Sequence, residues 1–132
     1  MLPRAHRLTR GGDYARVRRQ GRSRAHPLLI LAAAPNGGET TRVGLTMGKK
    51  IGSAVARNRA KRLLREAAHL RLNRLRPGYD IVLIGRPETA RCKLDEVQAA
   101  LDLLLRRSNL LLESSGTVQS PPGIGRDGTM RV

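Results

Sequence analysis

The segment from residue 49 to residue 66, KKIGSAVARNRAKRLLRE, combines the pattern of an amphipathic helix with a high density of positive charge. It holds seven Lys or Arg residues and no acidic residue before Glu66. Ser53 can cap a helix that extends to about Leu72, before the breakers Pro77 and Gly78. At about 100° per residue, one arc roughly 100° wide collects its small and apolar residues: Ala56, Ala60, Leu63, Leu64 and Ala67. The sequence therefore predicts a helix that packs closely against a sheet.

The remaining surface of this helix is predicted to be a cationic face. Its polar residues are Arg57, Asn58, Arg59, Lys61, Arg62 and Arg65. Solvated faces usually alternate acids and bases at one-turn spacing, whereas here like charges repeat and cost a few tenths of a kcal/mol per adjacent pair. Phosphate groups would relieve this repulsion, and the amide of Asn58 can both donate and accept hydrogen bonds. The face therefore favours binding to a polyanion.

The overall composition supports nucleic acid as that polyanion. The 132 residues carry a formal charge of +16, and the last 20 residues contribute equal numbers of acids and bases, so the excess belongs to residues 1–112. The only aromatic residues are Tyr14 and Tyr79, which argues against recognition by stacking several bases. We expect contacts with phosphates and with RNA shape to dominate.

The same composition argues against other classes of protein. No apolar run approaches the roughly 20 residues that a spanning helix needs, and the first residues lack the apolar core of a signal peptide. The single cysteine, Cys92, excludes an internal disulfide framework. We therefore expect a cytoplasmic protein with no membrane role.

The pattern along the chain predicts one domain over residues 1–112 and a disordered tail over 113–132, which is rich in Gly, Pro and Ser. A short basic helix is expected near residues 11–20, with Tyr14 and Val17 on one side. Strands are expected at 27–35 and 41–47, paired as a hairpin through the turn PNGG, and at 79–86, where a continuous apolar run suits a central position. A core-facing helix is expected from residue 94 to 107, or as far as 112.

No catalytic or metal-binding constellation is visible in the sequence. The three histidines are scattered, the serines lack a nucleophile elbow, and GKKIGS lacks the spacing of a phosphate-binding loop. The acidic residues are sparse, which argues against a two-metal nuclease site built by the protein. We expect no catalytic residue and no protein-bound metal.

Three segments together resemble the bacterial ribonuclease P protein subunit. The strongest match is RVGLTMGKKIGSAVARNRAKRLLRE, residues 42–66, in which a strand is followed by Lys-Lys, Gly and an Arg-Asn-Arg helix. RLTRGGDYARVRRQGR is similar to the family's amino-terminal helix and PGYDIVLIGRP to a later strand, so the resemblance covers roughly residues 7–108.

This resemblance implies an α/β (α+β) fold: a two-layer sandwich with a mixed central sheet, helices on one face and a left-handed βαβ crossover. It implies an accessory subunit of an endoribonuclease whose RNA is the catalyst and which removes the 5′ leader of precursor tRNA. Mg²⁺ would be bound mainly by the RNA and the substrate, the protein alone would be inactive, and one protein would bind one catalytic RNA.

The resemblance also implies two binding sites. The catalytic RNA would contact Lys49, Lys50, Arg57, Asn58, Arg59, Lys61, Arg62 and Arg65. The leader would lie in a cleft between the first helix and the sheet, lined by Arg10, Tyr14, Val17, Arg18, Ile30 and Arg42. Arg18 and Ile30 stand where rings are expected, so leader binding should depend on charge and therefore on salt.

Three other functions share parts of this pattern. A ribosomal or chaperone-type RNA-binding protein would share the charge and the amphipathic helix. A DNA-binding repressor would insert the 53–72 helix into a major groove, and an autonomous protein nuclease would cleave without any RNA.

Overall fold

The computed structural model describes residues 4–48 and 52–112, which form one four-stranded sheet with helices on both faces. The strands are β1 (Arg22–Ala25), β2 (Leu29–Pro35), β3 (Arg42–Met47) and β4 (Tyr79–Gly85), in the spatial order β1-β2-β4-β3. β1, β2 and β4 are antiparallel neighbours, and β3 is parallel to β4, so the sheet is mixed. The predictions for Lys49, Lys50 and residues 113–132 concern residues outside the described ranges.

The predicted hairpin between β2 and β3 is wrong, because β4 lies between them. Val82 of β4 pairs with Ala32 of β2 on one side and with Gly44 of β3 on the other. All but the first residue of β4 are buried, so a central place removes most apolar surface from water. The backbone N–H of Asn36 donates to the Gly78 carbonyl at 2.8 Å and so joins the turn after β2 to the start of β4.

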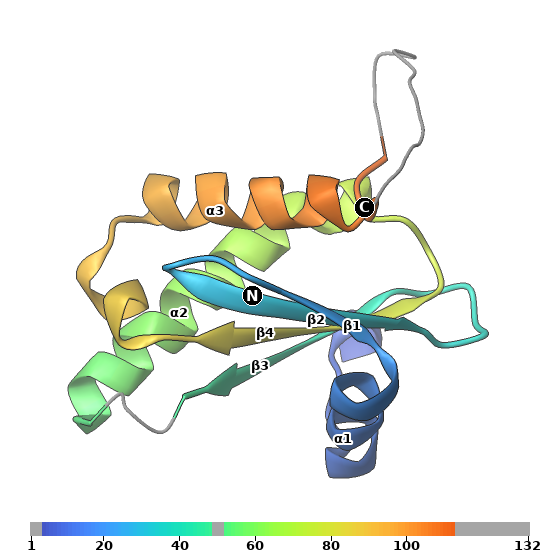
Figure 1. Cartoon of the computed structure of the whole chain (residues 1–132), viewed down its shortest axis with the longest axis horizontal. Helices are drawn as coiled ribbons and strands as arrows, with labels where there is room; N and C mark the ends of the chain where they lie inside the picture. Colours follow the sequence, from blue (N-terminus) through green and yellow to red (C-terminus); the bar gives the residue numbers. More distant parts are fainter. Residues whose placement is uncertain (1–3, 49–51, 113–132) are drawn as a thin grey trace.

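Two helices, α2 (Ala54–Arg71) and α3 (Leu94–Arg107), cover one face of the sheet (Figure 1). The predicted cap of α2 is confirmed, since the hydroxyl oxygen of Ser53 accepts from the Ala56 N–H at 3.1 Å. The main core lies between these helices and the sheet and includes Leu31, Leu64, Leu83, Leu101 and Leu104, each at most 2% exposed. The long connection from α2 to β4 passes through the 3₁₀ helix η2 (Leu72–Arg74), and η3 (Pro87–Arg91) joins β4 to α3.

The remaining helix, α1 (Gly11–Gln20), lies on the opposite face of the sheet (Figure 1). It covers a second, smaller core made of Leu8, Val17, Ala32, Ala34, Val82 and Ile84. The chain turns directly from α1 into β1 at Gly21, where an added Cβ would lie 2.4 Å from the carbonyl oxygen of Ala33. The two large helices therefore form one layer as expected, while α1 adds a third layer at one end.

The segment before α1 runs along β3, which is an edge strand of the sheet. It contains the 3₁₀ helix η1 (Arg4–His6), and Arg7 forms a parallel bridge with Val43. The Leu8 N–H donates to the Val43 carbonyl at 3.0 Å. In the described part of the chain, no helix has both the length and the apolar character needed to cross a membrane.

Candidate nucleic-acid interface

The cationic face of α2 points away from the core, as the helical period predicts. Ala60, Leu64 and Ala67 are fully buried beneath it. On the outer side, Asn58, Lys61 and Arg62 are exposed and Arg65 is half-exposed. Together with Val55, these four side chains line an open hollow on the surface of the helix. The helix therefore presents a largely polar surface to solvent.

The charges of this outer surface have no carboxylate partners within the described residues. The ion pairs found there join Arg16 and Arg42 to Asp80, Arg42 to Asp13, and Arg71 to Asp102. Lys61, Arg62 and Arg65 take part in none of them. The first turn of α2 also lacks acidic residues, so the positive end of the helix dipole adds to the same potential. The arrangement suits an extended anion such as a nucleic-acid backbone.

Arg57 and Arg59 have a different environment from the other cations of α2. A guanidinium nitrogen of Arg57 donates to the Gly48 carbonyl, just after β3, at 3.2 Å. Arg59 donates to the Ala90 and Cys92 carbonyls at 2.7 and 3.0 Å, across the end of η3. Both arginines thus hold α2 to neighbouring backbone while they remain at the surface.

The intramolecular contacts of Arg57 and Arg59 were not predicted, although the helical period contains a signal for them. At about 100° per residue, Arg57 lies within about 20° of Leu64 and Arg59 within about 40° of Leu63. Both are therefore at the rim of the buried stripe rather than opposite it. The predicted face consists of two rim arginines and an outer set, Asn58, Lys61, Arg62 and Arg65.

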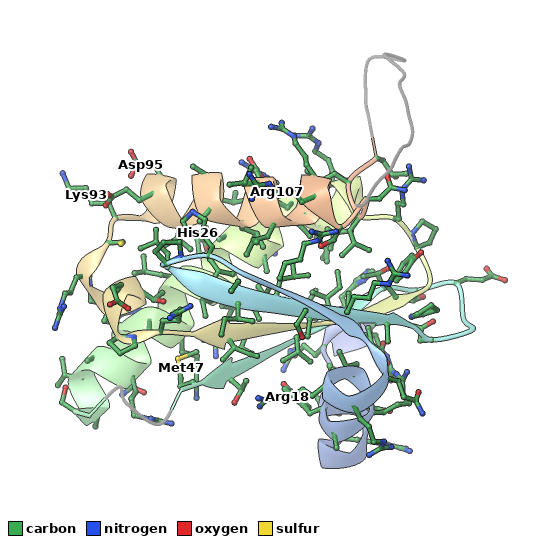
Figure 2. All side chains as sticks on the ribbon, in the orientation of Figure 1. Arg18, His26, Met47, Lys93, Asp95 and Arg107 are labelled. Carbon is green, nitrogen blue, oxygen red and sulfur yellow. The ribbon has the colours of Figure 1, made fainter. Side chains whose placement is uncertain are left out.

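Three of the predicted leader-binding residues lie at the surface of α1 or at its start. Arg10, which precedes the helix, and Arg18 are exposed, and Tyr14 is half-buried. Figure 2 shows the Arg18 side chain extending from α1 along the face of the sheet opposite α3. Ile30 of β2 is partly buried and packs against the same small core as Tyr14. These residues remain candidates for leader contact.

Tyr14 is fixed against β3 by both its ring and its hydroxyl group. An added Cβ on Gly44 would lie 2.5 Å from the ring, so only glycine leaves space for it there. The hydroxyl donates to the Leu8 carbonyl at 3.0 Å and accepts from the Leu45 N–H at 3.1 Å. Burial raises the pKa of Tyr14, although the hydrogen bond to Leu45 opposes this. One face of the ring is therefore used for packing within the fold.

One predicted leader-binding residue, Val17, must be corrected to a structural role, and a second, Arg42, is engaged within the fold. Val17 is 0% exposed, because it fills the core between α1 and the sheet, and it cannot contact a leader. Arg42 donates from Nε to Oδ1 of Asp80 at 2.9 Å and from Nη2 to Oδ2 at 2.7 Å. Its Nη2 also lies 3.6 Å from Asp13. Arg42 is thus held by ion pairs within the fold, and its side chain remains 34% exposed.

Asp80 is the centre of a buried polar cluster that sequence reasoning missed. Its carboxylate is fully buried and also binds Arg16 of α1 and, at 2.9 Å, the side-chain amide of Asn36. Burial raises the pKa of Asp80, but the hydrogen bonds from Arg42 and Asn36 and the charges of Arg42 and Arg16 outweigh it and lower the pKa overall. The cluster joins α1, β3, β4 and the turn after β2.

Comparisons with known proteins agree with this architecture. The family model described as Ribonuclease P matches residues 2–109. The ribonuclease P protein component of Herpetosiphon aurantiacus is 38% identical over 109 residues, which cover 83% of this chain and 89% of that protein. The same component from Chloroflexus aurantiacus is 41% identical over 121 residues, or 91% of this chain and 90% of that protein.

Solved structures of the same kind share the fold. The RNase P protein of Staphylococcus aureus superposes with a TM-score of 0.72 at 26% identity, covering 82% of this chain and 99% of that one. The RNase P protein of Thermotoga maritima gives a TM-score of 0.68 at 28% identity, covering 76% and 96% of the two chains.

Proposed function

The chain belongs to the ribonuclease P protein family, and on this premise we propose that the outer set of α2 binds the catalytic RNA through its phosphates. As a member of that family, it is a subunit of the ribonucleoprotein endoribonuclease that processes precursor tRNA, with the ribonuclease P RNA and the precursor tRNA as partners. The proposal concerns which residues make these contacts and what the protein adds to the reaction.

One observation carries the proposal: Lys61, Arg62 and Arg65 lie over a buried apolar stripe and have no carboxylate partner in the described chain. Each contact between one of these cations and a phosphate releases condensed counterions, which favours binding. Arg57 and Arg59 would add contacts at the rim, because a guanidinium group carries five N–H donors and those of Arg59 used within the fold are only two of them. Lys49 and Lys50 complete the proposed RNA-binding set.

The protein supplies charge rather than catalytic groups in this proposal. Within the described residues, no group of three or more His, Cys, Asp or Glu side chains is placed to hold a metal ion. We therefore assign Mg²⁺ to the RNA and the substrate, where phosphate oxygens provide the ligands that it prefers. By neutralising crowded phosphates, the cationic face would lower the Mg²⁺ concentration that cleavage requires. We further propose one protein for each catalytic RNA and a cytoplasmic complex.

The leader of precursor tRNA would contact the surface on the other side of the sheet. Arg10 and Arg18 would attract its phosphates, and Tyr14 and Ile30 would offer apolar surface beside them. Because one face of the Tyr14 ring packs on Gly44, we expect charge to contribute more than stacking, and leader affinity to fall steeply with salt.

Reconstitution with the ribonuclease P RNA of the same organism tests this assignment. At low Mg²⁺, the protein should accelerate cleavage of precursor tRNA, and the protein alone should not cleave. The variant Lys61→Ala with Arg62→Ala should bind the RNA roughly 30-fold more weakly at about 0.15 M salt, since each lost phosphate contact costs about fivefold there.

A matched control removes two exposed arginines from the end of α3, Arg106→Ala with Arg107→Ala. This variant loses the same charge but should keep RNA affinity within a few-fold. Equal losses in both double variants would show that only net charge matters. Cleavage that is unchanged by the wild-type protein at any Mg²⁺ concentration would contradict the proposal itself.

A further inference from the structure

The outer surface of α2 contains one apolar side chain that the charge argument does not explain. Val55, in the first turn of the helix, is 79% exposed, whereas the other large exposed hydrophobic residues of the described chain are 37–43% exposed. Valine is also a weaker helix former than alanine, lysine or arginine, because its branched side chain loses freedom in a helix. Neither packing nor helix stability therefore accounts for Val55.

Val55 lies on the same side of α2 as the outer set. At about 100° per residue, Val55, Asn58, Arg62 and Arg65 fall within an arc of about 80°, on the side of the helix opposite Leu64. The same residues, with Lys61, line the open hollow. The hollow therefore combines one apolar surface, one amide and three cations.

We propose that this hollow binds an unpaired nucleoside of the catalytic RNA, with its base against Val55, its polar edge near Asn58, and its flanking phosphates at Lys61, Arg62 and Arg65. The inference rests on the proposed function and makes it more specific. Phosphates alone would satisfy the cations but would leave Val55 in water.

The chemistry of the hollow favours an unpaired nucleoside over a continuous duplex. In an RNA duplex the faces of the bases are hidden by stacking, and the major groove is too narrow for side chains to read. Unpaired nucleotides expose both a base face and hydrogen-bonding edges, which match an apolar methyl surface next to an amide that donates and accepts. The surrounding cations explain why the apolar contact would be with a nucleic acid rather than with an apolar protein surface.

Binding of the full chain to the ribonuclease P RNA transcript, measured over a range of salt concentrations, tests the inference. Val55→Ser should weaken binding roughly tenfold, because about two methyl groups lose their apolar contact. The dependence of log Kd on log salt should keep its slope, because no charge is removed. Val55→Ile retains an apolar side chain and should bind within about twofold of the wild type. Serine and valine have similar helix propensities, so the melting temperature of free Val55→Ser should not change.

Two further variants separate failure of this inference from failure of the proposed function. Leu70→Ala, which trims another exposed apolar residue of α2, should leave binding unchanged. Lys61→Ala with Arg62→Ala should weaken binding and also reduce the salt slope. If that double variant is impaired while Val55→Ser binds like the wild type, the nucleoside contact is refuted and the phosphate contacts stand. If neither variant is impaired, the proposed RNA-binding face is itself wrong.

Chemical probing of the RNA bases gives an independent measurement. At least one unpaired base should be protected by the wild-type protein and become reactive in the complex with Val55→Ser. Probing is done at protein concentrations that saturate both complexes, so that weaker binding does not mimic lost protection. Protection confined to the backbone of paired regions, and identical for both proteins, would overturn the inference.

Discussion

The arginines of α1 and β3 differ from the outer arginines of α2 in whether they form ion pairs within the fold. Arg16 and Arg42 converge on the buried carboxylate of Asp80, which forms an ion pair with each of them within the fold. Arg62 and Arg65 of α2 find no carboxylate in the described chain. The difference is set by the position of the few acidic residues rather than by the arginines themselves. Because acidic residues are few in this chain, their positions determine which cations form ion pairs within the fold and which can bind a ligand.

The largest effect is expected where the fold depends on this pairing. Asp80→Ala should lower the free energy of unfolding by about 3 kcal/mol, since removing one partner of a buried ion pair leaves the others uncompensated. The value is at the low end of the usual range because Arg16 and Arg42 retain side-chain exposures of 27% and 34%. Urea denaturation measures the change.

The matched control for this variant is Asp13→Ala. Asp13 also faces Arg42, but at 3.6 Å and with a side chain that is 24% exposed rather than fully buried, so its removal should cost less than about 1 kcal/mol. If the two variants lose equal stability, the contrast between the buried cluster and the solvated face loses its basis.

Low pH should weaken the Asp80 cluster in the wild-type protein. Burial alone would raise the pKa of Asp80, but its bonds to Arg42 and Asn36 and the charge of Arg16 give a folded-state pKa below the ordinary value. The cluster therefore contributes its full stability above the unfolded pKa of about 3.9, and this contribution is lost as pH falls through the folded pKa.

Melting temperatures recorded between neutral pH and about pH 2 test the acid sensitivity. In Asp80→Asn the melting temperature should depend less on pH in the acid range, because the titrating group is gone. Identical acid profiles for the two proteins would mean that Asp80 does not carry the sensitivity.

An intermediate effect is expected at the rim of α2, where the two kinds of arginine meet. Arg57→Ala with Arg59→Ala should lower stability by about 1 kcal/mol, because hydrogen bonds to the Gly48, Ala90 and Cys92 carbonyls are lost. RNA affinity should also fall, by roughly 30-fold at about 0.15 M salt. Circular dichroism should retain the helical signal, and thermal melting should show the loss.

The stability of Arg57→Ala with Arg59→Ala should be compared with that of Lys61→Ala with Arg62→Ala. The outer variant should lose RNA affinity with almost no change in melting temperature, since Lys61 and Arg62 form no hydrogen bond or ion pair within the described chain. Equal stability losses in the two variants would remove the distinction between rim and outer cations.

The smallest effect is expected on the face covered by α1. Arg18→Ala should weaken binding of precursor tRNA with a 5′ leader by about fivefold at about 0.15 M salt, through the loss of one phosphate contact. Mature tRNA, which lacks the leader, should bind equally well to both proteins. If the loss is the same for both RNAs, Arg18 does not contact the leader.

The elements of this fold were largely predictable from local patterns. The period of Ala60, Leu64 and Ala67 identified α2 and its buried side, and the uninterrupted apolar residues of β4 identified a central strand. β1 was not predicted, because its sequence RSRA is polar and three of its four residues are exposed. The order of the strands was also missed, since the turn signal after β2 carries no information about a strand that enters the sheet more than 40 residues later.

The sequence predicted which residues of α2 form the candidate site, but not which of its arginines make contacts within the fold. Helical spacing placed Asn58, Lys61 and Arg62 on the outside, but the partners of Arg59 lie 31 and 33 residues away in the chain. The partner of Arg42 is 38 residues away, and no local pattern pairs it with Asp80. Val55 was overlooked because a single apolar residue does not alter the polar character of a helix face.

The segment before α1 has a consequence for how these molecules behave when concentrated. An edge strand presents a row of backbone groups that another chain can extend into a larger sheet, a common route to aggregation. Here the Leu8 N–H donates to the Val43 carbonyl, and the Leu45 N–H donates to the Tyr14 hydroxyl. Both contacts lie on the outer margin of β3. The chain thus covers part of the edge formed by β3, which hinders extension of the sheet on that side independently of the repulsion between charges.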